Sequence, residues 1–281
     1  MNQPTNNVKN YKPVCKCIYC GREHSKREPC GSEHIIPLSL GGPLILPRSS
    51  CVSCSEKTRA FEEVCARSIF GPYRLAGNLP TRHPNERPFT LKIHTHSGPN
   101  TIREEHSLPL KEYPIIGALM PELEIAGILR GSPSTEAFQV VPRIINLVRN
   151  VEAWKGLEAQ KKQFEVTREF KITDFARLLA KIAHAYAVAE FGLGAFDSFL
   201  PPLILGNSLK LPDFVGGVAS PTPNGGWFLG EHGTKVESLI EHSLNCEVVR
   251  AADQSTYLTV VIQLLQSYAP KYRVVVAGAQ G

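Results

Sequence analysis

Cysteine is almost absent beyond residue 65, because seven of the eight cysteines precede residue 66 and the eighth is Cys246. Long apolar runs are also missing. The best candidate for a membrane span, residues 185–206, contains Glu190, Asp197 and two prolines, which excludes a simple transmembrane helix. The first 15 residues have no apolar core of the kind that a secretory signal needs. We therefore expect a cytoplasmic chain with no membrane partner, in which paired cysteines are metal ligands more often than disulfides.

Positive charge is concentrated in the first third of the chain. Residues 1–90 contain 13 Lys and Arg against 7 Asp and Glu, whereas the remainder is nearly balanced. An excess of this size favours an anionic partner such as a nucleic-acid backbone, although solubility alone would also explain it. A length of 281 residues with 42% hydrophobic content suggests two domains.

Composition divides the chain into an N-terminal and a C-terminal part. We predict a disordered N-terminus over residues 1–14, a cysteine-rich unit over 15–75, a proline-rich linker over 76–88 and a mixed α/β domain over 89–281. The predicted fold class is therefore α+β.

Periodicity indicates the main elements. Within the cysteine-rich unit, residues 55–70 have helical spacing and are followed by Gly71-Pro72, which we expect to end the helix. The strongest helix of the chain is predicted over residues 173–192, capped by Thr173 or Asp174. Alternation predicts a strand over 89–96 and an antiparallel pair formed by 256–265 and 271–278.

Two C-x₂-C pairs mark the cysteine-rich unit as a metal site. The pairs are "CIYC" and "CVSC", formed by Cys17, Cys20, Cys51 and Cys54. This spacing lets two tight turns present four thiolates tetrahedrally to one Zn²⁺. Four ordinary buried cysteines are the alternative, but they would not predict two such pairs. A structural zinc ion would replace the hydrophobic core that a unit of this size lacks.

Residues 33–42, "EHIIPLSLGG", lie between the two cysteine pairs. A C-x₂-C pair, this acid-histidine segment with its Gly-Gly turn, and a second C-x₂-C pair that opens a helix resemble the HNH endonuclease family. The resemblance covers residues 17 to about 70 and implies a zinc-stabilised ββα module, similar to a treble clef. It also implies hydrolysis of phosphodiester bonds in nucleic acid, with DNA as the expected substrate.

The resemblance assigns roles to individual residues. It makes His34 the general base and makes Glu33 and Ser55 ligands of a catalytic Mg²⁺ or Mn²⁺ ion. Neighbours on a regular strand point to opposite faces, so both Glu33 and His34 can serve one site only where the backbone is irregular. Nucleic-acid phosphates are expected to contact basic residues near the site, namely Arg48, Lys57 and Arg59; for Lys57 and Arg59, a solvated helix face is an equal alternative.

The sequence departs from the family at two positions. Residues 41–50 contain no Asn, and Ser55 stands where the family has His or Asn, which is a better metal ligand than a hydroxyl. The alternative function is therefore a zinc-binding nucleic-acid or protein-interaction module that has lost catalysis. For the C-terminal domain we expect a role in specificity, regulation or homo-oligomer formation, and no catalytic role, because it lacks a clustered acid-His or Cys-His set. By resemblance alone, bacterial or phage defence is the expected setting.

Overall fold

The computed structural model describes residues 9–81, 84–97, 102, 104–132, 137–141, 144–160, 163–165, 170–219, 227–229, 242–265 and 269–279. Most of the predicted disordered N-terminus, residues 1–8, and residues 82–83 of the predicted linker lie outside this part of the chain. Within it, no helix combines the length and the apolar character that a membrane span requires.

The N-terminal region is a small sheet followed by two helices. Strands β1 (Lys9–Asn10), β3 (Leu44–Ser50) and β2 (Gly31–His34) form the sheet in that order, with β1 parallel and β2 antiparallel to β3. Lys9 and Asn10, which lie in the predicted disordered N-terminus, therefore belong to a strand. Helix α1 (Val52–Ser68) starts two residues after β3 and is followed by α2 (Gly71–Ala76).

The segment after β2 explains the two glycines. The strand ends at His34, and residues Leu38–Leu40 form a 3-10 helix, so the strand is shorter than the apolar run suggested. Gly41 then adopts a φ of 81°, in the left-handed region. A Cβ atom on Gly42 would lie 2.2 Å from the carbonyl oxygen of Ile36. The Gly-Gly pair thus permits both the turn and the close return of the chain into β3.

The middle of the chain forms three small sheets and two helices. Strands β10 (Gln163–Glu165), β4 (Thr90–His96) and β5 (Glu104–Pro109) form one sheet, and strands β12 (Trp227–Leu229), β9 (Ile144–Arg149) and β6 (Ile115–Leu119) form another. A third contains β7 (Glu122–Leu123) and β8 (Val140–Val141). The helices are α3 (Gly127–Arg130) and α4 (Val151–Ala159), and short 3-10 turns cover Pro84–Glu86 and Leu110–Glu112.

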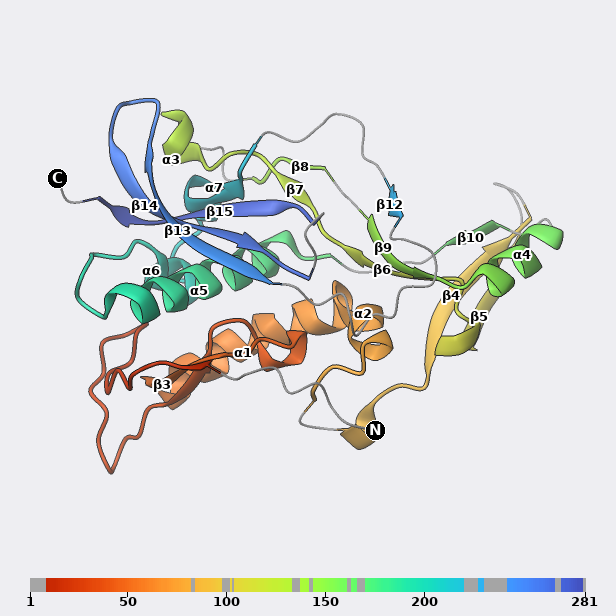
Figure 1. Ribbon diagram of the computed structural model, residues 1–281, viewed down its shortest axis with the longest axis horizontal. Helices are drawn as coiled ribbons and strands as arrows, with labels where there is room; N and C mark the ends of the chain where they lie inside the picture. The colour runs from red at the N-terminus through yellow and green to blue at the C-terminus, as the bar shows by residue number, and fades with distance from the viewer. Residues whose placement is uncertain are drawn as a thin grey trace.

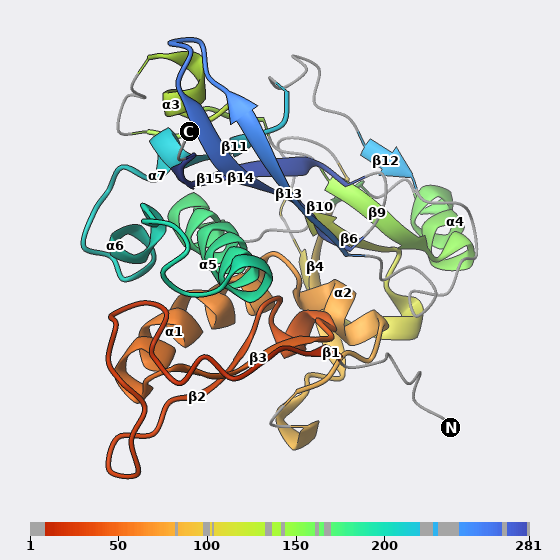
Figure 2. The same cartoon turned by 60° about the vertical axis from the view of Figure 1, so that its left-hand side comes forward.

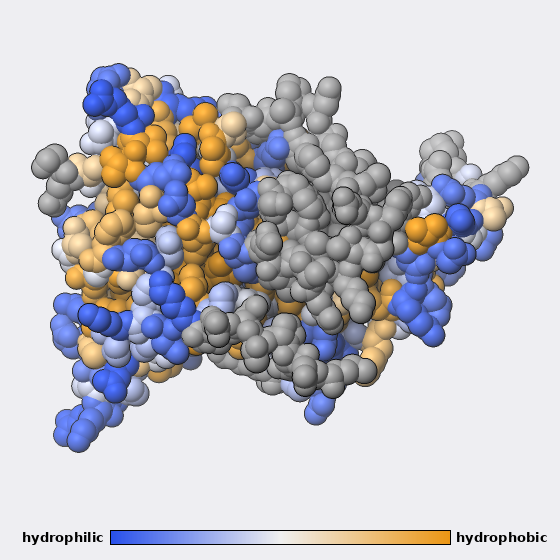
Figure 3. All heavy atoms as spheres, viewed as in Figure 1, coloured by the Kyte–Doolittle hydropathy of each residue, from blue (hydrophilic) through white to orange (hydrophobic). Residues whose placement is uncertain are grey.

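A long helix and an antiparallel sheet make up the C-terminal part. Helix α5 (Ile172–Phe191) is followed by α6 (Leu200–Ile204) and α7 (Leu211–Phe214). The sheet contains β11 (Val215–Gly217), β15 (Lys271–Gly278), β14 (Thr256–Gln263) and β13 (Ser243–Arg250) in that order. Helix α5 lies between this sheet and α1 (Figures 1 and 2). Hydrophobic residues gather on the face over the sheet, whereas the loop that projects at lower left is hydrophilic (Figure 3).

One hydrophobic core joins the N-terminal region to the C-terminal sheet. Its buried residues include Phe61 and Phe70 from the first region together with Phe175 and Tyr272 from the last. The ring of Phe175 lies 6.4 Å from that of Phe70 and 5.3 Å from that of Tyr272, between ring centroids. Packing is therefore continuous across the boundary predicted at residues 76–88.

The predicted helices and the antiparallel C-terminal pair are confirmed, and the mixture of helix and sheet agrees with the α+β class. Two details were wrong. Helix α5 begins at Ile172 after the cap residue Lys171, so Thr173 and Asp174 lie inside its first turn. Gly71-Pro72 does not only end α1 but also opens α2, because proline is well tolerated in the first turn of a helix.

Candidate metal centre and adjoining cleft

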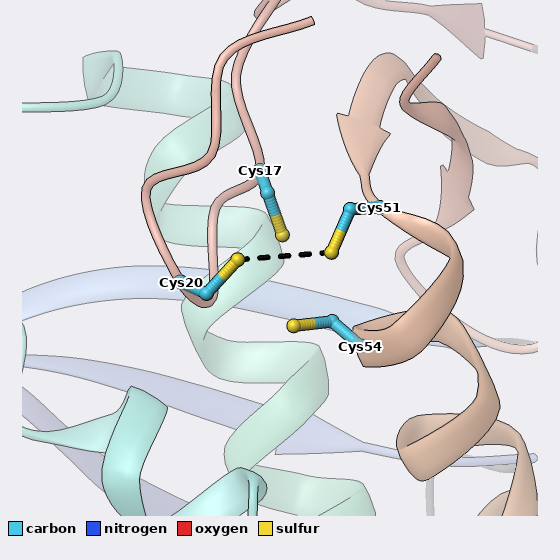
Figure 4. Close-up of side chains that lie close together, drawn as sticks. All are labelled: Cys17, Cys20, Cys51 and Cys54. Carbon is cyan, nitrogen blue, oxygen red and sulfur yellow. Dashed lines mark hydrogen bonds between the residues drawn. The ribbon is translucent and has the colours of Figure 1, made fainter. Parts of the chain in front are cut away.

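Four cysteine side chains converge where the N-terminal loop meets the start of α1. Cys17 and Cys20 come from the loop before β2, Cys51 is the residue that caps α1, and Cys54 lies in its first turn. Their sulfur atoms all lie within 4.8 Å of one another. They point toward a common centre, with the Sγ atoms of Cys20 and Cys51 3.7 Å apart (Figure 4). The predicted cysteine set is therefore brought together.

Local backbone bonds and one distant histidine hold the first cysteine pair in place. The Cys17 amide donates to the Arg22 carbonyl at 2.7 Å, and the Gly21 amide returns to the Cys17 carbonyl at 2.9 Å. His184 of α5 is buried, and its Nε2 lies 2.7 Å from the carbonyl oxygen of Ile18, between the two cysteines. Burial lowers the pKa of His184 to about 4, so the ring is neutral and Nε2 is the donor.

Three thiols of the cluster have shifted pKa values, two of them raised and one lowered. Burial raises the pKa of Cys17 to about 11 and raises that of Cys54 further, with the nearby Cys17 thiol adding to the shift. For Cys51, burial acts in the same direction, but hydrogen bonds from Ser53 and from the Cys54 backbone outweigh it and lower the pKa to about 6. A divalent cation among four thiols would favour thiolates at all four positions. The cluster could therefore hold a metal ion such as zinc.

Glu33 and His34, adjacent on β2, have different surroundings. Glu33 is 6% exposed, and its Oε1 lies 2.6 Å from the Nζ of Lys181 in α5. His34 is half-buried, and its Nδ1 atom is enclosed by protein. Both residues pair in register with β3, while the irregular pairing lies just before them, between Gly31 and Glu33. The irregularity thus lies just before the acid-histidine pair rather than within it, and both residues nevertheless line one cleft.

A cleft of about 1080 Å³ adjoins this strand end and runs along α1. Glu33, His34 and Ser55 all line it, so three predicted site residues share one surface. Of the three predicted phosphate contacts, Arg59 also lines the cleft. Lys57 is exposed on α1, and Arg48 is exposed with a φ of 50° where β3 departs from regular pairing with β2; neither is part of the described cleft lining.

The structure adds residues that the sequence interpretation missed. Glu62 lines the cleft from α1, and Lys181 lies behind it with its Nζ 2.8 Å from Glu62 Oε1. The helical spacing of Ser55, Arg59 and Glu62 could have identified Glu62, because residues at i, i+4 and i+7 share a helix face. The lining also contains further basic residues, which are Arg67, Arg74, Arg87 and Lys92.

The charges behind the cleft are balanced by burial and pairing. Burial alone would lower the pKa of Lys181 and favour the neutral amine. The carboxylates of Glu33 and Glu62 have a larger opposite effect and raise the pKa of Lys181 above its ordinary value. Burial raises the pKa of Glu62, an effect that Lys181 opposes and Glu33 reinforces. Glu62, which lines the cleft, thus has an increased affinity for protons.

Comparison with protein-family models, with curated proteins and with solved structures gives no match to this chain.

Proposed function

We propose that the chain is a metal-dependent endonuclease of the HNH type that hydrolyses phosphodiester bonds in nucleic acid, with DNA as the substrate. The single observation that carries the proposal is the position of His34. Its strand ends beside a large cleft that Ser55 and Arg59 of α1 also line. The cysteine cluster at the start of α1 is the second feature of the family, and we assign Zn²⁺ to it as a structural ion.

In the proposed reaction His34 accepts the proton of the attacking water. Because its Nδ1 atom is enclosed, Nε2 is the ring nitrogen that can act from the cleft. Ser55 and Glu33 contribute oxygen donors of the kind that Mg²⁺ and Mn²⁺ prefer, and Glu62 adds a second carboxylate to the same cleft. A divalent cation held there would stabilise the charge on the leaving oxygen.

The far side of the cleft offers contacts for the nucleic-acid backbone. Arg74 is half-buried, with its Nε donating to the Ser39 carbonyl at 2.8 Å. Burial lowers the pKa of Arg74, and the like charges of Arg87 and Arg67 lower it further, so three guanidinium groups lie near one another. An anion between them would relieve this repulsion, which supports a phosphate at this position.

A cleavage assay with a matched histidine control tests the proposal. Plasmid DNA is incubated with the protein and with Mg²⁺ or Mn²⁺, beside His34→Ala and His94→Ala. His94 lies on β4 and contacts Glu105 at 3.5 Å. We expect His34→Ala to lower kcat by a factor on the order of a hundred or more with little change in DNA affinity, while His94→Ala retains activity. Equal cleavage by the parent and His34→Ala would contradict the proposal.

The role of Ser55 is tested separately. Ser55→Asn places an amide carbonyl in the first turn of α1, where Asn is tolerated. We expect it to raise the cleavage rate at limiting Mg²⁺ and Ser55→Ala to lower it, with Mn²⁺ reducing both differences. Identical rates for all three proteins across a metal titration would remove Ser55 from the site and leave Glu62 as the candidate ligand.

The second candidate function is a zinc-binding nucleic-acid or protein-interaction module without catalysis. It is favoured by Ser55 at a ligand position and by the ion pair between Glu33 and Lys181, which already engages one oxygen of Glu33. In that case the parent protein binds DNA in a salt-dependent manner but does not cut it with either metal ion, and Ser55→Asn does not restore cleavage.

A further inference from the structure

Lys181 connects the C-terminal part of the chain to the strand that carries His34. The residue lies in the middle of α5 and is fully buried. Its Nζ atom contacts Glu33 of β2 at 2.6 Å and Glu62 of α1 at 2.8 Å. The same ammonium donates hydrogen bonds to the backbone carbonyls of His34 and Ile35, the latter at 3.3 Å. One side chain therefore joins three elements that are distant in sequence.

These backbone contacts fall at the point where regular structure stops. β2 ends at His34, and one further backbone bond to β3 follows it, from the Ile35 amide to the Leu44 carbonyl at 3.0 Å. Carbonyl groups at a strand end need other partners when they are buried. The ammonium of Lys181 donates to the carbonyl oxygens of His34 and Ile35. These bonds limit the movement of the backbone that carries the imidazole.

A purely apolar core would not require this arrangement. Burying an ammonium ion and two carboxylates costs more than packing hydrophobic residues of similar volume, and such groups contribute little net stability. The same helix is otherwise rich in buried alanine and leucine. A buried cation that bonds the backbone of a candidate general base is better explained by precise placement of that base.

We propose that Lys181 is a positioning residue for His34, so that α5 completes the candidate active site. This inference rests on the proposed function of His34, and it assigns the C-terminal part of the chain a role in the reaction. The ammonium fixes the carbonyls of His34 and Ile35 and holds Glu33 and Glu62 as a pair beside the cleft. Glu33 and Glu62 both line the cleft, and the Glu62 side chain is the more exposed of the two, at 21% against 8%.

A charge-matched double variant separates positioning from charge balance. With all three groups ionised, Glu33, Glu62 and Lys181 sum to one negative charge. Lys181→Met/Glu62→Gln has the same sum, because only Glu33 remains charged. Lys181→Met alone leaves two buried carboxylates without a cation, so it is the variant that could fail to fold. Glu62→Gln alone keeps the lysine and serves as the control.

Two measurements are made on each variant. The first is the pair kcat and KM for DNA cleavage, and the second is the hydrogen-exchange rate of the Ile35 amide. For the double variant we expect a melting temperature well above that of Lys181→Met. We expect kcat to fall by about tenfold or more with little change in KM. The exchange of the Ile35 amide should be accelerated at least about tenfold. Glu62→Gln should exchange at Ile35 as the parent does.

Each outcome decides the question. Parental exchange at Ile35 in the double variant overturns the proposal, and so does accelerated exchange with parental kcat, since Lys181 would then hold the strand without serving His34. If the parent protein itself does not cleave DNA, the proposed function fails. The exchange rates still show in that case whether Lys181 holds the His34 backbone, so the two failures are distinguishable.

Discussion

Two polar clusters adjoin β2 and α1, and they differ in the origin of the cation that each could hold. The carboxylates of Glu33 and Glu62 surround an ammonium that belongs to the chain, from Lys181. The four thiols of the cysteine cluster surround a common centre with sulfur atoms alone, which favours an external ion (Figure 4). The first cluster is complete when the chain folds, whereas the second could hold a metal ion taken from solution.

Both clusters are nevertheless attached to the same helix. Lys181 and His184 lie three residues apart on α5. Lys181 contacts the carboxylates of Glu33 and Glu62, and His184 contacts the loop between Cys17 and Cys20. Residues at this spacing share a helix face. Helix α5 therefore supports both clusters of the N-terminal region. Substitution of Lys181 or His184 tests how far each cluster depends on α5.

The largest effect is expected from loss of the thiol cluster. Cys51→Ser removes a central ligand, and structural zinc contributes about 10–16 kcal/mol in small zinc domains, comparable with the total stability of a typical protein. We expect about one zinc ion per parent chain and an unfolded N-terminal region in the variant, measured by elemental analysis and proteolysis. Cys15→Ser changes an exposed thiol and is the control. Folded parent protein that contains no metal would contradict the prediction.

Removal of the internal cation should have the next largest effect. Lys181→Met leaves two buried carboxylates unpaired and is expected to lower the free energy of unfolding by about 3–5 kcal/mol, measured by urea denaturation. The matched control is Lys155→Met, on α4 outside the cluster. A loss below about 1 kcal/mol, the usual value for an exposed ion pair, would contradict the prediction. It would show that the Glu33–Lys181–Glu62 cluster does not depend on its internal cation.

Acid should weaken the contact between α5 and the thiol cluster. The pKa of His184 falls from an ordinary 6.5 to about 4 on folding because the ring is buried. The unfolded chain therefore binds this proton more readily, and the stabilising contribution is complete above pH 6.5 and is lost as the pH falls toward 4. A shift of this size corresponds to about 3 kcal/mol.

The matched experiment compares the free energy of unfolding at pH 7 and pH 4.5 in the parent, His184→Gln and His106→Gln. His106 is a half-buried residue of β5, outside both clusters. We expect the pH dependence to be smaller in His184→Gln and unchanged in His106→Gln. The same slope in all three proteins would assign the acid sensitivity to other groups.

The smallest effect concerns two basic residues on one turn of α1. Arg59 lines the cleft and Lys57 does not. Arg59→Glu is expected to weaken DNA binding several-fold and to reduce the slope of log affinity against log salt by about one unit or more, whereas Lys57→Glu should have less effect. Fluorescence anisotropy at several salt concentrations measures both. Equal losses would indicate that overall charge, and not the cleft, determines binding.

Local patterns in the sequence predicted what depends on local geometry. Two C-x₂-C pairs and the periodicity of α1 and α5 are each contained in a short segment, and the structure brings the four thiols together as the spacing indicated. The Gly-Gly pair was identified as a turn, but its physical cause, the close approach of Gly42 to the Ile36 carbonyl, requires the folded backbone.

Contacts between distant segments were not predictable in the same way. Lys181 appears in the sequence as the single lysine within the predicted amphipathic helix, with nothing to indicate its partners, and its contact with His34 spans 147 residues. Glu62 was available from helical spacing, yet only the fold places it against a buried cation. The predicted separation into two parts was based on composition. Composition contains no information about contacts between distant residues, such as those of Phe175 with Phe70 and Tyr272.

The distance between Lys181 and His34 along the chain has a consequence during protein synthesis. A ribosome that adds about 5–20 residues per second requires roughly 7 to 30 s to extend the chain from His34 to Lys181. Throughout this interval the four thiols are already available to a metal ion, but Glu33 and Glu62 remain hydrated and the backbone at His34 lacks its lysine. On the proposed function, a ribosome-bound chain that ends before α5 should be a poor nuclease, and cutting activity would arise only after α5 has left the ribosome.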